Sequence, residues 1–141
     1  MIGLDTNVLA RYYVDDADDA GDAEAKRQRL AARRLIDSGQ ALMVSKTVVL
    51  ELEWVMRGYY GFTQTEVGSV LRHLLGLTHV TVEGREAVEQ ALANSEAGLD
   101  FADALHHASY RACISVATFD DRRFARRAKR LGLAPAVTVL A

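Results

Sequence analysis

Cysteine and proline are nearly absent from this sequence, which has one of each, and no long hydrophobic run occurs in it. The single cysteine, Cys113, excludes an internal disulfide and favours a reducing compartment. No stretch approaches the roughly 18 apolar residues that a membrane span needs. The acid Asp5 follows Met1 too soon for a secretory signal. We therefore expect a soluble, cytoplasmic protein that has no membrane partner.

Lysine is also scarce, since only Lys26, Lys46 and Lys129 are lysines among the 17 basic residues, and the other 14 are arginines. A formal net charge of -2 does not indicate nucleic-acid binding by the chain as a whole. The arginines nevertheless cluster at residues 27–34 and 122–130, so local basic faces remain. Either cluster can also be the solvent-exposed side of an amphipathic helix.

The length of 141 residues, half of them hydrophobic, predicts one domain over residues 1–141. A chain of this length buries enough surface to need no structural metal. Short apolar runs alternate with amphipathic ones, which indicates an α/β fold in which helices cover a parallel sheet. We predict strands at 2–5, 41–44, 79–82, 115–118 and 136–140. We predict helices at 7–13, 23–36, 47–59, 63–75, 85–94, 101–113 and 123–131, with a capping box at Thr63 and Glu66.

Acidic residues stand where ligands bind in open parallel sheets, at the carboxyl ends of strands. Asp5 follows the first predicted strand and Asp120 follows the fourth, whereas Asp100 and Asp103 share one face at the start of a helix. Glu51 lies on a mostly apolar helix and faces either the sheet edge or water, while its neighbour Glu53 is expected to face water.

Helix capping is the alternative explanation for several of these acids. Asp5, Asp100 and Asp120 are good N-cap residues, and Asp103 suits the first turn of a helix. The acidic run at residues 15–22 is interpreted as a solvated loop, because Ala20 occupies a position where a calcium site needs a ligand.

Four or five acids at convergent positions, without histidine and cysteine at metal spacing, form a more specific pattern than any one acid. Oxygen ligands select Mg²⁺ or Mn²⁺ over zinc or copper. These ions assist phosphate chemistry by activating water.

Four segments resemble the four acidic motifs of PIN-domain ribonucleases, in order and across essentially the whole chain: residues 2–9, Glu51, residues 100–105 and residues 116–120. The chain's size further resembles that of VapC-type toxins from toxin–antitoxin pairs. The resemblance implies a three-layer α/β/α domain with a central, mostly parallel sheet of about five strands. It also implies an endoribonuclease that leaves a 5′-phosphate and a 3′-hydroxyl.

The resemblance assigns the catalytic acids to Asp5, Glu51, Asp103 and Asp120. Asp5, Asp103 and Asp120 would bind Mg²⁺ or Mn²⁺ with help from Asp100, and Thr6 and Thr118 would orient the acids. The family commonly has an aromatic or aliphatic residue three places after the fourth acid. Phe124 lies three after Asp121 and four after Asp120, so Asp121 remains an alternative to Asp120.

An acidic centre needs cations nearby to admit RNA, and Arg11, Arg122, Arg123 and Arg126 lie near the motifs. The tyrosines at 12, 13, 59 and 60 either stack on bases or belong to the core or an interface. The resemblance implies a small VapB-like antitoxin as partner, a homodimer, and contact with DNA only through the antitoxin.

We expect a core or interface role for Trp54, structural roles for His106 and His107, and burial for Cys113.

Two other functions compete with the nuclease. Asp5 could accept a phosphoryl group, although the neighbouring residues do not match such enzymes. The chain could also be a catalytically inactive PIN-like module that binds RNA or a protein partner.

Overall fold

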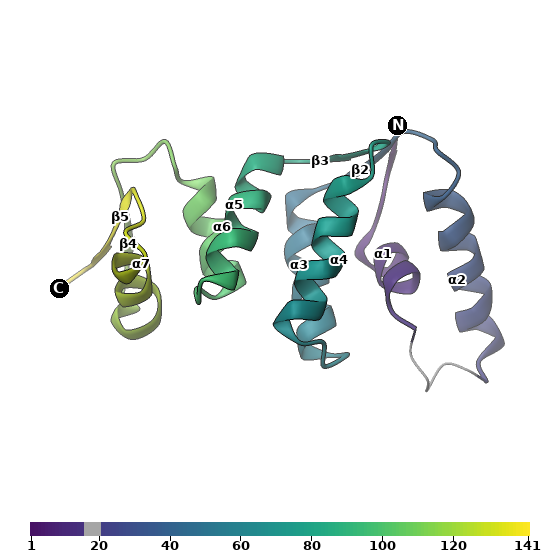
Figure 1. The fold of residues 1–141 in the computed structure, drawn as a ribbon, viewed down its shortest axis with the longest axis horizontal. Helices are drawn as coiled ribbons and strands as arrows, with labels where there is room; N and C mark the ends of the chain where they lie inside the picture. The colour runs from purple at the N-terminus through teal and green to yellow at the C-terminus, as the bar shows by residue number, and fades with distance from the viewer. Residues whose placement is uncertain (16–20) are drawn as a thin grey trace. The chain divides into compact units, whose positions relative to one another are not determined.

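The computed structural model describes residues 1–15 and 21–141 (Figure 1). The chain divides into two compact units, Met1–Glu83 (unit 1) and Gly84–Ala141 (unit 2), and each is described by itself. Most of the acidic loop expected at residues 15–22 lies outside the described residues. The single domain remains a prediction.

A parallel sheet of three short strands forms the centre of unit 1. Strands β1 (Ile2–Gly3), β2 (Leu42–Val44) and β3 (Val80–Val82) are ordered β1-β2-β3. The side chains of β2 and β3 that alternate toward the core are buried, as the period of two predicts. The last hydrogen bond from the β1 segment to β2 is that of the Leu4 N–H to Met43 O at 2.9 Å. Strand β1 ends before Asp5, because Asp5 caps the next helix.

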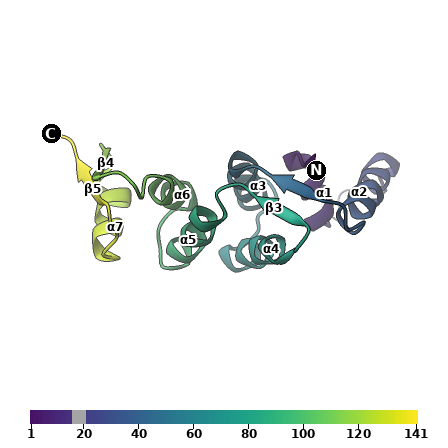
Figure 2. The same cartoon turned by 90° about the horizontal axis from the view of Figure 1, so that it is seen from above.

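Four helices complete unit 1: α1 (Thr6–Tyr13), α2 (Ala23–Ile36), α3 (Lys46–Gly58) and α4 (Gln64–Gly76). Helix α1 packs against α2 and α3 (Figure 1), and α4 lies against α3 and β3 (Figure 2). Polar side chains start all four of these helices, and Asp5 caps α1. Asp22 caps α2, Ser45 caps α3, and the predicted capping box of Thr63 and Glu66 is confirmed.

Unit 2 contains α5 (Arg85–Glu96), α6 (Phe101–Ser109), β4 (Ser115–Thr118), the π-helix η2 (Asp121–Ala125), α7 (Arg126–Arg130) and β5 (Ala136–Val139). Strands β4 and β5 pair in parallel over four residues each. Buried His107 bonds the carbonyl of Pro135 through Nε2 at 2.8 Å, which ties α6 to the segment before β5. The structural role expected for His107 is therefore confirmed.

The α/β class is confirmed, since the described residues form five parallel strands and seven α-helices. The predicted helix at 123–131 is in fact a π-helical turn followed by α7. None of the described helices has both the length and the apolar character required to cross a membrane.

Three side chains differ from expectation. Helix α6 ends at Ser109 rather than Cys113, because the Tyr110 N–H closes the last turn onto carbonyls of α6, and Cys113 is exposed instead of buried. Glu53 is buried instead of facing water, and its Oε1 accepts from Arg57 Nε at 2.8 Å. Trp54 is 62% exposed, so it is not a core residue, and its interface role remains a prediction.

Candidate functional site

Asp5 lies between β1 and α1 and is the N-cap of α1. Its Oδ1 accepts the Thr6 backbone N–H at 2.8 Å, and its carbonyl accepts the Val8 N–H at 3.1 Å. The Thr6 hydroxyl is buried and, within the described part of the chain, has no hydrogen-bond partner. Thr6 thus orients Asp5 through its backbone amide.

Two further acids of unit 1, Glu51 and Glu83, lie on or beside α3. Glu51 is exposed on α3, which packs against α1. Glu83 follows β3, and its Oε1 accepts the Lys46 backbone N–H at the start of α3 at 2.8 Å. Glu83 was not selected from the sequence, although an acid directly after a predicted strand was the signal that selected Asp5 and Asp120. It adds an acid to the carboxyl end of this sheet.

In unit 2, two aspartates start the helical elements that precede and follow β4. Asp100 is the N-cap of α6, and its Oδ2 accepts the Asp103 N–H at 3.3 Å. Asp120 is the N-cap of η2, and its Oδ1 accepts the Arg123 N–H at 2.9 Å. The Asp120 N–H donates to Thr118 Oγ1 at 3.0 Å, so the hydroxyl of Thr118 fixes the backbone of Asp120.

Asp103 is the electrostatic centre of this group. It is half-buried, and burial raises the pKa of its carboxyl first, followed by the negative charges of Asp100 and Asp120. The positive charges of His106 and Arg127 lower this pKa but do not cancel the increase. The structure therefore places three of the predicted acids of unit 2 within electrostatic range of one another, from two elements that are distant in sequence.

The neighbours of Asp120 and Asp121 differ. Asp121 Oδ2 forms an ion pair with Arg126 at 3.0 Å, whereas Asp120 acts on the charge of Asp103. Phe124 is buried beneath this turn, edge-on to the ring of His107 at 6.4 Å between ring centres. These contacts favour Asp120 as the acid that acts with Asp103, and Arg126, which was predicted to bind substrate, partly compensates Asp121.

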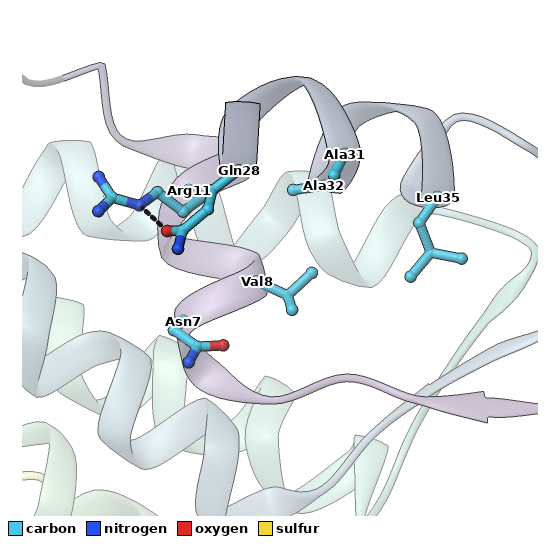
Figure 3. Close-up of a pocket in the computed structure, with 7 residues that line it drawn as sticks. All are labelled: Asn7, Val8, Arg11, Gln28, Ala31, Ala32 and Leu35. Carbon is cyan, nitrogen blue, oxygen red and sulfur yellow. Dashed lines mark hydrogen bonds between the residues drawn. The ribbon is translucent and has the colours of Figure 1, made fainter. Parts of the chain in front are cut away.

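Arg11 lies at one end of an apolar pocket of about 260 Å³ between α1 and α2. Figure 3 shows Val8 and Leu35 directed into the space between the two helices. Arg11 Nε donates to Gln28 Oε1 at 2.9 Å at the end of this pocket. Arg11 thus holds its position beside an apolar surface.

The tyrosines considered as stacking residues have other contacts. Tyr12 donates to Asp37 at 2.9 Å, and the hydroxyl of Tyr13 bonds His73 Nδ1 at 2.8 Å. Burial raises the pKa of both phenols, which keeps them protonated. Tyr59 is 77% exposed and lies edge-on to Tyr60. Tyr12 and Tyr13 therefore serve to join the helices of unit 1.

Among residues 1–15 and 21–141, no three side chains of His, Cys, Asp or Glu lie close enough together to hold a metal ion. The chemistry of the donors in unit 2 nevertheless suits a hard divalent cation. Asp100, Asp103 and Asp120 are all oxygen donors. Burial and, to a smaller extent, repulsion from the other two acids raise the pKa of Asp103, and a cation would offset that repulsion.

An α/β fold in which carboxylates follow parallel strands defines a class of proteins suited to metal-assisted chemistry on phosphates. Within that class, the sequence profile of the PIN domain matches residues 2–130. The chain therefore belongs to the PIN-domain family, a family of nucleases that generally use divalent metals. Comparisons with curated proteins and with solved structures gave no match.

Proposed function

We propose that this chain is a Mg²⁺- or Mn²⁺-dependent endoribonuclease and the toxin of a VapBC-type toxin–antitoxin pair. The observation that carries the proposal is the position of Asp103, which is half-buried and within electrostatic range of Asp100 and Asp120. Like charges held together cost free energy in the absence of a cation, and such strained titratable groups concentrate at functional sites. Helix capping alone explains Asp100 and Asp120 but not the half-buried position of Asp103 within electrostatic range of both.

Asp5, Asp103 and Asp120, with help from Asp100, are the residues that would hold the metal. A bound Mg²⁺ or Mn²⁺ supplies a lowered pKa for its water and neutralises charge on the reacting oxygens. Glu51 either positions the attacking water or binds a second ion. The water oxygen bonds to phosphorus, the bond from phosphorus to the 3′ oxygen breaks, and that oxygen takes the proton. The products carry a 5′-phosphate and a 3′-hydroxyl.

We assign the antitoxin to the apolar pocket between α1 and α2. The pocket combines an apolar floor that includes Val8 and Leu35 with the cation of Arg11 at one end, so it suits an apolar segment that also carries a carboxylate. The toxin acts in the cytoplasm on RNA, forms a homodimer, and contacts DNA only through the antitoxin.

The test is cleavage of RNA by the purified chain. Cleavage should require Mg²⁺ or Mn²⁺, stop with a chelator, and be abolished in Asp5→Asn and in Asp103→Asn. Asp22→Asn is the matched control, because Asp22 also caps a helix but lies on α2 and has no proposed catalytic role. Full activity of both active-site variants would reject the proposal.

The alternative is an inactive PIN-like module, and one observation favours it. Asp5, Asp100 and Asp120 all cap helices, so each has a structural reason to be present without catalysis. A wild-type chain that binds RNA but leaves it intact with either metal would establish this alternative.

A further inference from the structure

An aromatic side chain is exposed at the acidic site of unit 2. Phe119 stands between Thr118 and Asp120 and is 80% exposed. Burying a phenylalanine side chain removes a large apolar area from water and stabilises the fold, so a ring that stays this exposed is unusual. Its position directly beside Asp120 suggests that it contacts what the acids act on.

The turn that carries Phe119 is held in place on both sides. The Asp120 N–H donates to Thr118 Oγ1 at 3.0 Å, and Asp120 Oδ1 accepts the Arg123 N–H at 2.9 Å. The Leu140 N–H also bonds the Thr118 carbonyl at 2.9 Å, which fixes the end of β4 against β5. The ring is therefore presented from an ordered backbone, so binding a ligand to it costs little ordering of the chain.

Cations follow Phe119 along η2 and α7. This segment buries Phe124, Ala125 and Ala128 against unit 2. Its remaining positions hold six basic residues and the acid Asp121: Arg122, Arg123, Arg126, Arg127, Lys129 and Arg130. All six except the partly covered Arg127 are exposed. The cations recur at each turn of the helix, roughly every 5 Å along its axis.

The chemistry of this strip fits single-stranded nucleic acid. Five of its six cations are arginines, whose planar guanidinium groups match phosphate oxygens in pairs. An exposed ring offers a stacking surface to an unpaired base, which a duplex does not present. An acidic protein segment would use the cations but would have no specific need for the aromatic ring.

We propose that Phe119 and the cations of residues 122–130 form a single-stranded RNA-binding strip in which Phe119 stacks on a base beside the bond that is cut. Arg122 and Arg123 bind the adjoining phosphates, and Arg126 and Lys129 continue the strip. The assignment rests on the proposed nuclease function, because RNA is taken as the substrate. It adds a positioning residue, Phe119, that acts by holding the substrate next to Asp120.

The experiment measures binding of a short, labelled, single-stranded RNA of mixed sequence by fluorescence anisotropy over a range of salt concentrations. Asp103→Asn serves as the background, so that the RNA is not cut. Phe119→Ala should weaken binding about tenfold without changing the salt dependence, as expected for one lost stacking contact. Phe119→Leu should weaken it similarly because it keeps an apolar group but no aromatic face, and Phe119→Trp should retain binding.

Arg122→Gln and Arg123→Gln should each reduce the slope of log affinity against log salt by about 0.7, the amount expected for one lost phosphate contact on a single strand. Arg34→Gln on α2 is the matched control, because it removes an exposed arginine from the other basic cluster and should leave the slope unchanged. Unchanged melting temperatures of the arginine variants would show that these effects are not due to unfolding.

The proposal is overturned if Phe119→Leu binds as tightly as the parent, if the slopes of the arginine variants are unchanged, or if the parent does not bind the RNA. It is also overturned if poly-glutamate displaces the RNA equally well from the parent and from Phe119→Ala. That result would indicate an acidic protein partner. Failure of the nuclease proposal is separate. RNA binding that depends on Phe119, with no cleavage by wild type in Mg²⁺ or Mn²⁺, would reject catalysis and keep this binding strip.

Discussion

Replacing Asp120 separates its structural role from its proposed catalytic role. Asp120→Asn keeps a side-chain oxygen that can accept the Arg123 N–H, now at 2.9 Å, and asparagine caps helices about as well as aspartate. It removes a charge that favours the helix N-terminus by about 0.3–1 kcal/mol. It also removes the repulsion that raises the pKa of Asp103, which acts in the opposite direction. The free energy of unfolding should therefore change little.

Asp120→Ala removes the cap as well as the charge. Loss of the cap costs about 1 kcal/mol and loss of the charge adds a few tenths. For a chain of this size 1 kcal/mol corresponds to roughly 4 °C in melting temperature, so this variant should melt about 4–6 °C lower while Asp120→Asn melts near wild type.

Cleavage should respond differently, because both variants lose the metal-binding carboxylate. A loss of several kcal/mol of charge stabilisation corresponds to about two to three orders of magnitude in rate. The assays are thermal unfolding in chelator and RNA cleavage in Mg²⁺. If Asp120→Asn cleaves at the wild-type rate while Asp120→Ala is only less stable, Asp120 is a cap alone and the reasoning fails.

Three further predictions concern charge and exposure. The pKa of Asp103 is raised on folding above its ordinary value of 3.8, so its contribution to stability is present below that value and is lost as pH rises through the folded pKa. In chelator, Asp103→Asn should therefore melt higher than wild type at pH 7 and at the same temperature as wild type at acidic pH. A lower melting temperature of the variant at pH 7 would contradict this. Removing Arg57 leaves the buried carboxylate of Glu53 without its partner at 2.8 Å, so Arg57→Ala should lower the free energy of unfolding in urea by roughly 1.5–3 kcal/mol. The double variant with Glu53→Leu should recover most of this loss. Additive effects of the two substitutions would show that the two side chains do not interact. Cys113 is exposed, so a thiol reagent should label the native protein as fast as the unfolded protein, and protection in the native state would show that the thiol is covered.

Local sequence determined most of the secondary structure. Helix α2 and strand β4 have the predicted bounds, and the capping box of Thr63 and Glu66 formed as expected. These features depend on hydrogen bonds between residues a few positions apart and on the period of apolar side chains, both of which can be recognised in one segment. The positions of Asp5, Asp100 and Asp120 at the starts of helices follow from the same local rules.

Only the tertiary structure decided which polar side chains are buried and which acids meet. Glu51 and Glu53 are two positions apart on one helix, yet Glu51 is exposed and Glu53 is buried, because burial depends on the elements that pack on each face of α3. The pKa of Asp103 is likewise raised first by burial and in part by the charge of Asp120, which lies 17 residues away in sequence. Short-range hydrogen bonds are encoded within each segment, whereas burial and long-range repulsion arise only when separate segments come into contact.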